Sequence, residues 1–195
     1  MPVLGYVRQA AERNIILMGR AVTGEPGRWM IARMIFGAFV VALAAVGPAN
    51  AGASQDGIAA LSRHDYAAAA RIFRPLAERG NARAQTYLGY MYANGYGVPQ
   101  NYIESARWYA LASERGDATA QYMLGLMYDK GHGVPQDYVE AYKWLNLAVA
   151  GAIGRNRQDW VKIRDAVASK LTLAQITKGQ ELAIEWQATR VTRGR

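Results

Sequence analysis

Residues 81–116 read NARAQTYLGYMYANGYGVPQNYIESARWYALASERG, and residues 117–152 read DATAQYMLGLMYDKGHGVPQDYVEAYKWLNLAVAGA. The two segments align without a gap, and 17 of the 36 positions are identical. Internal repetition at such a period is the signature of a helical solenoid, in which each unit covers the hydrophobic face of its neighbour. The same register extends backwards, because residues 78–80 (Glu-Arg-Gly) recur 36 positions later. The sequence therefore predicts about three stacked units.

The first half of each unit predicts an amphipathic helix with a glycine inside it. Asn81 and Asp117 are favourable N-cap residues. Gly89 and Gly125 fall inside the helices, where glycine costs about 1 kcal/mol relative to alanine. We therefore expect a close helix contact at both glycines, filled by a large side chain such as the tryptophan that both units share. The apolar stripe of the first of these helices is Ala84, Leu88, Met91 and Tyr92.

The loop Gly95–Tyr102 and its copy Gly131–Tyr138 predict the turn between two helices. The first glycine is placed to end one helix in a left-handed conformation, and the proline prevents that helix from continuing. The following Asn or Asp caps the second helix, and a glutamate three residues later makes an arrangement close to a capping box. Tyr96 and His132 are the positions that this interpretation leaves without a part in the turn, so any role of the loop beyond turning the chain is expected at these two side chains.

Residues 155–195 depart from the repeat but keep helical signals. Thr172 and Gln175 form a capping box that opens a last helix running towards Thr189. The ends of a solenoid otherwise expose its core, so they need a polar outer face. We therefore predict a basic C-terminal helical cap, whose first apolar stripe is Trp160, Ile163, Val167 and Leu171.

Residues 34–51, MIFGAFVVALAAVGPANA, follow two arginines and contain an uncharged apolar run. The run is shorter than the about 20 residues that cross a bilayer, and the final Ala-Asn-Ala is typical of a cleavage site after Ala51. We predict a signal peptide over residues 30–51 and a periplasmic or secreted protein; the alternative is an uncleaved inner-membrane anchor. Residues 1–29 are interpreted as an N-terminal extension before a natural start at Met30.

The net charge of +8 is concentrated at the two ends of the chain. Residues 52–154 carry nine basic and nine acidic side chains, whereas residues 155–195 carry nine and four. A nucleic-acid-binding protein is expected to concentrate its positive charge on the binding domain, so no nucleic-acid partner is expected. The cap could instead make a weak contact with an anionic envelope surface, through Arg155, Arg157, Lys162 and Arg164.

The repeated segment resembles the Sel-one-like repeat, a relative of the tetratricopeptide repeat. The family's alanine–glutamine, leucine–glycine–x–methionine–tyrosine, glycine–x–glycine–valine and glutamine–aspartate–tyrosine elements all occur here, and residues 65–85 match one further second helix. The resemblance implies an all-α fold, a right-handed α-solenoid of antiparallel helix pairs with about three repeats over residues 52–154. It also implies a scaffold for protein–protein contacts. The C-terminal tail is similar to that of short bacterial exported members.

The sequence offers no constellation of catalytic residues. It contains no cysteine and only two histidines, which excludes Cys/His nucleophile pairs and histidine or thiolate metal clusters. GxSxG, HExxH and P-loop motifs are absent from it. Asp129 and His132 are near neighbours, but two ligands rarely hold a metal. We therefore expect no enzymatic activity, no cofactor and no metal; the alternative is a protein that binds or hydrolyses cell-wall glycan or β-lactams.

The partner-binding surface is predicted on the exposed stripe of the first helices, which line the concave face of a solenoid. This stripe includes many positions at which the two units differ, and its aromatic and Met side chains suit peptide recognition. The alternative is that Tyr87, Tyr90 and Leu126 complete the core between units. We predict a monomer that takes another protein or peptide segment on Arg83, Thr86, Tyr87, Tyr90 and Asn94 of one unit and Thr119, Tyr122, Met123, Leu126 and Lys130 of the next.

Overall fold

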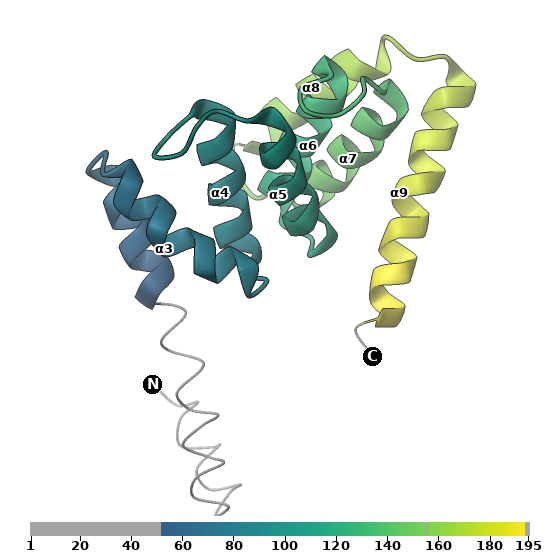
Figure 1. Cartoon of the computed structure of the whole chain (residues 1–195). Helices are drawn as coiled ribbons and strands as arrows, with labels where there is room; N and C mark the ends of the chain where they lie inside the picture. The colour runs from purple at the N-terminus through teal and green to yellow at the C-terminus, as the bar shows by residue number, and fades with distance from the viewer. Residues whose placement is uncertain (1–51, 155, 194–195) are drawn as a thin grey trace, which may run out of the picture. The chain divides into compact units, whose positions relative to one another are not determined.

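The computed structural model describes residues 52–154 and 156–193, where all regular secondary structure is helical. The predicted signal peptide and the N-terminal extension lie outside these residues. Residues 52–62 form a helix, and it is followed in Figure 1 by α3 (Tyr66–Glu78), α4 (Ala82–Asn94), α5 (Tyr102–Glu114), α6 (Ala118–Lys130), α7 (Tyr138–Gly151), α8 (Asn156–Ala168) and α9 (Leu173–Arg193). None of the described helices combines the length and the apolar character needed to cross a membrane.

Helix pairs follow one another as the repeat predicts. We call residues 52–80 unit 1, residues 81–116 unit 2 and residues 117–152 unit 3. From α3 to α7, each helix packs on the next one in the chain (Figure 1). The short connections between these helices make neighbours antiparallel, and the predicted all-α solenoid of helix pairs is confirmed.

The first helices of units 2 and 3 begin and end as the sequence predicts. The amide of the third helical residue donates to Asn81 Oδ1 at 2.9 Å and, in unit 3, to Asp117 Oδ1 at 2.8 Å. Gly95 and Gly131 follow these helices in the left-handed conformation, with φ of 71° and 70°. Each contact satisfies backbone groups that a helix end leaves without an intrahelical partner.

The second helices start at the predicted caps, but the expected capping box is incomplete. Asn101 Oδ1 accepts two backbone N–H groups at 3.0 and 3.1 Å, and Asp137 Oδ1 does so at 2.8 and 3.1 Å. Glu104 does not reach back to the cap; it pairs with Arg107 at 2.9 Å, and the equivalent glutamate of unit 3 pairs with a lysine at 3.1 Å. The cap amides are not available to the glutamates, because Asn101 N–H donates to the Tyr92 carbonyl at 2.9 Å and Asp137 N–H donates to the Tyr128 carbonyl at 3.0 Å.

The glycines inside the first helices mark the closest helix contacts. A Cβ on Gly89 would lie 2.9 Å from the ring of Tyr109, and one on Gly125 would lie 2.8 Å from Leu145 Cγ. The expected close packing is confirmed, but the expected partner, the shared tryptophan, is wrong. The contact comes from the residue after the tryptophan, because consecutive residues point about 100° apart around a helix.

The same contact identifies unit 1 as a true copy of the repeat. A Cβ on Gly57 would lie 2.6 Å from Phe73 Cζ, and Phe73 stands 36 residues before Tyr109. The helix formed by residues 52–62 therefore packs on α3 as α4 packs on α5. The loop between the two helices is shorter in unit 1 and has no glycine–proline sequence.

The glycine–proline loops also join neighbouring units. Tyr96 stacks on Tyr66 with ring centroids 4.3 Å apart, and His132 stacks on Tyr102 at 4.9 Å. Both partners are the first residue of the second helix in the preceding unit. The role beyond the turn that was expected at Tyr96 and His132 is therefore a contact between units.

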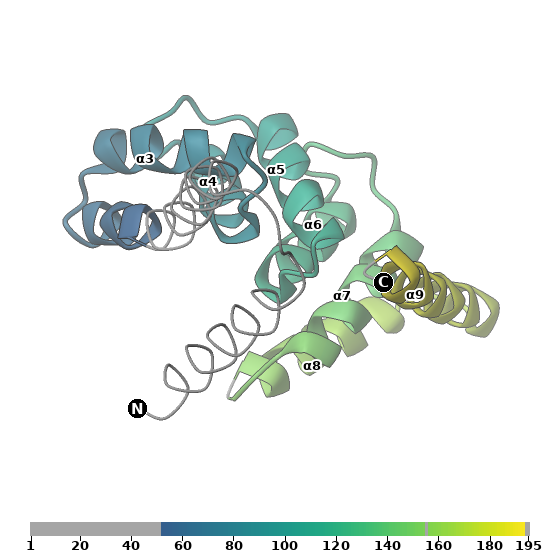
Figure 2. The same ribbon diagram turned by 90° about the horizontal axis from the view of Figure 1, so that it is seen from below.

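The C-terminal helices do not form a regular fourth pair. Both α8 and α9 pack on α7, and they have little contact with each other (Figures 1 and 2). Gly179 of α9 meets Tyr142 of α7, with 2.9 Å from a Cβ built on the glycine to the ring. The predicted capping box is confirmed, since the Thr172 amide donates to Gln175 Oε1 at 2.9 Å and the Gln175 amide donates to Thr172 Oγ1 at 3.3 Å.

Candidate functional site

A groove of about 370 Å³ lies between the C-terminal halves of α4 and α6, above the start of α5. We call it the α4–α6 groove. Five of the ten predicted partner-binding residues line it: Tyr90, Asn94, Met123, Leu126 and Lys130. Its other lining residues are Ala93, Tyr102, Tyr109, Met127 and His132.

Three of the remaining predicted residues lie on the first turns of α4, away from the groove. Tyr87 is half-buried and stacks on Phe73 with ring centroids 4.8 Å apart, and Arg83 lies 5.9 Å from the centroid of the Tyr87 ring. The Thr86 hydroxyl donates to the Ala82 carbonyl at 3.0 Å. Tyr87 thus packs on the core between units 1 and 2, which is the structural alternative that the sequence left open for it.

The last two predicted residues lie near the start of α6. Tyr122 stacks on Trp160 of α8 with ring centroids 4.8 Å apart, so the cap covers it. Thr119 is exposed on the same helix. The stripe predicted as one surface is therefore divided: its C-terminal half lines the groove, and much of its N-terminal half packs on neighbouring units.

Three residues that line the α4–α6 groove were not predicted, because they do not belong to the first helices of the units. Tyr102 and Tyr109 come from α5, and His132 comes from the loop after α6. The spacing of residues along one helix cannot show which residues of the next helix line the same groove. One signal was available, because Tyr109 and its equivalent Leu145 differ between otherwise similar units.

The tyrosines give the groove neutral hydrogen-bond donors. Burial raises the pKa of Tyr90, and the neighbouring hydroxyls of Tyr96 and Tyr66 raise it further. Burial also raises the pKa of Tyr109 well above its usual value, with a smaller contribution from Tyr90. Both phenols therefore stay protonated at neutral pH, and the groove combines apolar walls with O–H groups that can bond to peptide carbonyls.

Asp129 and His132 do not form a metal site. Asp129 is paired with Lys130 at 2.9 Å and with Lys170 from beyond α8, and His132 stacks on Tyr102. Across residues 52–154 and 156–193, no three His, Asp or Glu side chains gather closely enough to hold a metal ion. The ammonium groups of two lysines thus take the positions beside the carboxylate that a cation would need.

Two of the cations predicted to face an anionic surface are paired with neighbouring carboxylates on α8. Of the four cations considered for an anionic surface, Lys162 pairs with Asp159 at 3.2 Å and Arg164 with Asp165 at 2.6 Å. Arg155 lies outside the described residues. The local field of each of these two cations is weaker than that of an unpaired cation, because a carboxylate lies beside it.

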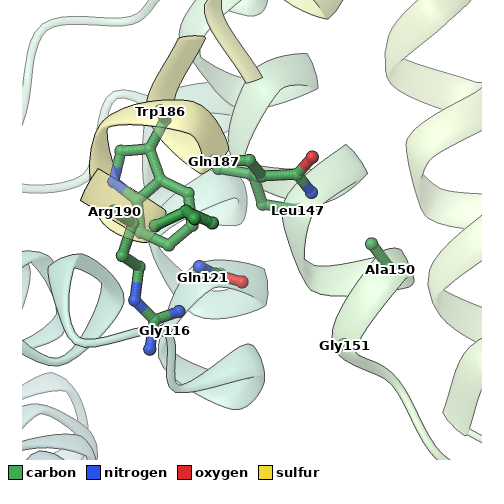
Figure 3. A pocket seen from close by; sticks show the side chains of 9 residues that line it. Gly116, Gln121, Leu147, Ala150, Gly151, Trp186, Gln187 and Arg190 are labelled. Carbon is green, nitrogen blue, oxygen red and sulfur yellow. The ribbon is translucent and has the colours of Figure 1, made fainter. Parts of the chain in front are cut away.

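A second groove, of about 560 Å³, lies under the C-terminal half of α9 at the turn between α5 and α6. Trp186 Nε1 donates to Glu114 Oε2 at 3.1 Å, and its ring lies 6.0 Å from that of Trp144. Arg190 donates to the Arg115 carbonyl at 2.6 Å. Figure 3 shows Trp186 and Arg190 on the same side of α9, with Arg190 reaching towards Gly116. We call this the α9 groove.

Comparison with known proteins agrees with this architecture. A family model described as the Sel1 repeat matches residues 82–117 and 118–151, which correspond to units 2 and 3. The chain therefore contains two Sel1 repeats, and the resemblance seen in the sequence is confirmed. The fold is an α-solenoid in which units 2 and 3 are Sel1 repeats; unit 1 is recognised from its packing in the structure.

Two solved structures are similar to the chain. A protective antigen present in uropathogenic Escherichia coli strains, which displays an SLR fold, is 27% identical with a TM-score of 0.65, covering 70% of this chain and 29% of its own. A Sel1 repeat protein from Oxalobacter formigenes is 36% identical with a TM-score of 0.48, covering 50% of this chain and 39% of its own. The chain spans less than half the length of either structure. A comparison with curated protein sequences gives no significant match.

Proposed function

We propose that this protein is an exported scaffold of the bacterial envelope that binds a segment of another protein in the α4–α6 groove, on the concave face of its solenoid. The Sel1-repeat fold supports the general role, because this fold typically mediates protein–protein interaction without catalysis. The apolar run before Ala51 supports export. The protein acts as a monomer whose binding surface is formed before the partner arrives.

The observation that carries the proposal is the pairing of exposed tyrosines with an apolar floor in one groove. Tyr90 and Tyr102 are 39% and 40% exposed, which leaves large aromatic surfaces open beside the half-buried Met123 and Leu126. Tyrosine buries much area at low entropic cost and keeps a polar tip. Aromatic side chains of this kind supply much of the binding energy in protein interfaces.

An extended segment is the occupant that this chemistry fits. Its apolar side chains would lie against Met123 and Leu126, and its carbonyl groups would accept hydrogen bonds from the phenol O–H groups of Tyr90 and Tyr102. Met side chains adapt to partners of different shape. Preformed rigid walls lower the entropic cost of binding because the scaffold itself does not need to fold.

Site-specific photocrosslinking tests this proposal. A photoreactive amino acid at Tyr90 is expected to capture one partner in cells, and the same amino acid at Ile103, 69% exposed on α5, serves as the control. With the captured partner purified, the double variant Tyr90→Ala/Leu126→Ala should weaken binding at least about tenfold, or about 1.4 kcal/mol. Equal affinity of this variant and Ile103→Ala would show that the α4–α6 groove is not the binding surface.

Export is tested separately. Sequencing the N-terminus of the protein recovered from the periplasm is expected to give Gly52 as the first residue, as cleavage after Ala51 requires. Recovery of the uncleaved chain from the inner membrane would support the membrane-anchored alternative and contradict cleavage.

A further inference from the structure

The α9 groove has a copy one unit earlier that no helix of the described residues fills. A groove of about 380 Å³ lies at the turn between α3 and α4, and we call it the α3–α4 groove. Four of its lining residues stand 36 positions before lining residues of the α9 groove; one of these pairs, Arg115 and Gly151, differs in charge. The other pairs are Gly80 and Gly116, Gln85 and Gln121, and Leu111 and Leu147.

The two tryptophan-binding features of the α9 groove recur in the copy. Glu78 is the equivalent of Glu114, which accepts the indole N–H of Trp186, and Trp108 is the equivalent of Trp144, which packs beside that indole. Both Glu78 and Trp108 line the α3–α4 groove. Within the described residues, the Glu78 carboxylate forms no hydrogen bond or ion pair.

Among residues 52–154 and 156–193, no helix covers the copy as α9 covers the original, and burial shows this. Leu147 is 3% exposed beneath α9, whereas Leu111 at the equivalent position is only half-buried. Gln85 lines the α3–α4 groove and is 2% exposed, yet its Oε1 has no hydrogen-bond partner among the described residues. A buried polar atom without a partner is costly, and the equivalent Gln121 of the α9 groove has no such atom.

The copy differs from the α9 groove in charge. Unit 3 has Gly151 where unit 2 has Arg115. In unit 2 the guanidinium of Arg115 lies against Gly80. In unit 3, where Gly151 has no side chain, Arg190 of α9 takes the equivalent place against Gly116. In the α3–α4 groove the guanidinium is already present, and no ion pair within the described residues involves Arg115 or the adjacent Arg79. An occupant of this groove must therefore be acidic where α9 is basic.

We propose that the α3–α4 groove is a second binding surface, which takes a helix of another protein. This helix presents a tryptophan to Glu78 and Trp108, as α9 does to the equivalent residues. One turn later it presents a carboxylate to Arg115. The protein thus carries, in its own α9, a template of the partner helix, with glutamate in place of Arg190.

The test uses peptides of the α9 sequence, residues 173–193, with a fluorescent label, and the purified full chain. The peptide with Arg190→Glu is expected to bind saturably, and the peptide with the original arginine to bind at least about tenfold more weakly. Adding Trp186→Ala to the glutamate peptide should abolish binding. Fluorescence anisotropy at physiological salt gives the affinities.

Variants of the full chain locate the binding. Glu78→Ala should weaken binding of the glutamate peptide at least about tenfold, while the matched variant Glu114→Ala, which alters only the α9 groove, should leave it unchanged. Both glutamates are exposed, so neither change endangers folding, and circular dichroism verifies this.

Three outcomes would overturn the proposal. The first is no saturable binding of the glutamate peptide. The second is binding that depends on Glu114 and not on Glu78, because the peptide would then be exchanging with the resident α9. The third is self-association of the full chain that Glu78→Ala removes, measured by sedimentation, because the occupant would then be a second copy and not a different protein.

Discussion

Lys170 Nζ donates a hydrogen bond to Asp129 Oδ1 and so connects residues 41 apart in the sequence. The same ammonium group lies 4.8 Å from the ring centroid of Tyr138. Tyr138 stands 36 residues after Tyr102, whose ring is covered by His132. Lys170 therefore covers the last unit as the loop of a following unit would have done. The cap replaces the missing repeat contact with an ion pair.

Replacing Lys170 should weaken the attachment of the cap. Asp129 has only 5% of its side chain exposed, so loss of one charged donor leaves a buried carboxylate with a single partner. We expect Lys170→Met to lower the free energy of unfolding by about 2 kcal/mol, measured by urea denaturation. Lys130→Met is the control, because Lys130 is 59% exposed, and it should cost less than about 1 kcal/mol. Equal losses would contradict this assignment.

The Asp129 contribution should depend on pH. Burial raises the pKa of Asp129, but hydrogen bonds from Lys130 and Lys170 lower it more, so the folded-state pKa lies below the unfolded one. The stabilisation is therefore complete above the unfolded-state value of about 3.9 and is lost as the pH falls through the folded-state pKa. The difference in unfolding free energy between the original chain and Asp129→Asn should shrink between pH 5 and strongly acidic pH. A difference independent of pH would refute this.

Two glycines of one loop should respond differently to alanine. Both are in the left-handed region, with φ of 70° at Gly131 and 72° at Gly133. A Cβ on Gly131 meets Gln136 at 3.3 Å, whereas one on Gly133 would lie 2.0 Å from the backbone oxygen of Tyr102. Gly131→Ala should cost about 1–2 kcal/mol for its conformation alone. Gly133→Ala should cost clearly more in thermal unfolding, and equal melting temperatures would contradict the contact between units.

Removing the indole of Trp186 should release α9. The ring is half-buried against Trp144 and bonded to Glu114, so we expect Trp186→Ala to destabilise the C-terminal helix by about 2 kcal/mol. Hydrogen exchange should show faster exchange in α9 but not in α4. Ile184→Ala is the control on the same helix, because its side chain is 66% exposed; comparable exchange in both variants would argue against docking through Trp186.

Pro75 should be replaceable with a gain in stability. It lies inside α3 and is exposed, and a proline there removes one helical hydrogen bond. Pro75→Ala should raise the free energy of unfolding by about 1–2 kcal/mol, because the gain in helix propensity exceeds the lost restriction of the unfolded chain. Thermal unfolding followed by circular dichroism measures the change. A lower melting temperature would mean that α3 depends on the proline for its packing.

Local signals in the sequence were sufficient to predict where several helices begin and end. Asn81 and Asn101 cap helices, Gly95 ends one, and Thr172 opens the last one, all as predicted. Each of these contacts forms within a few residues of the chain, so its geometry follows from the residue types and their spacing. The 36-residue period added the number of units and their order.

The candidate site was only partly predictable. Tyr90 and Leu126 were predicted from the stripe of the first helices, and both line the α4–α6 groove. Tyr102 and His132 were missed because they reach that groove from the second helix and from a loop. Tyr122 was assigned to the surface, yet Trp160 of the cap stacks on it. The spacing of residues along one helix does not show where the neighbouring helix lies.

The sequence by itself determined the helices, their caps, the period and hence the repeat class. Only the tertiary structure decided which side chains of different units face each other, such as Tyr96 on Tyr66 and Tyr109 against Gly89. The physical reason is that helix formation and capping are short-range interactions, whereas the contact between units depends on the rotation from one helix pair to the next. That rotation arises from the sum of many packed contacts, and it places α9 over the α9 groove while no described helix covers the α3–α4 groove.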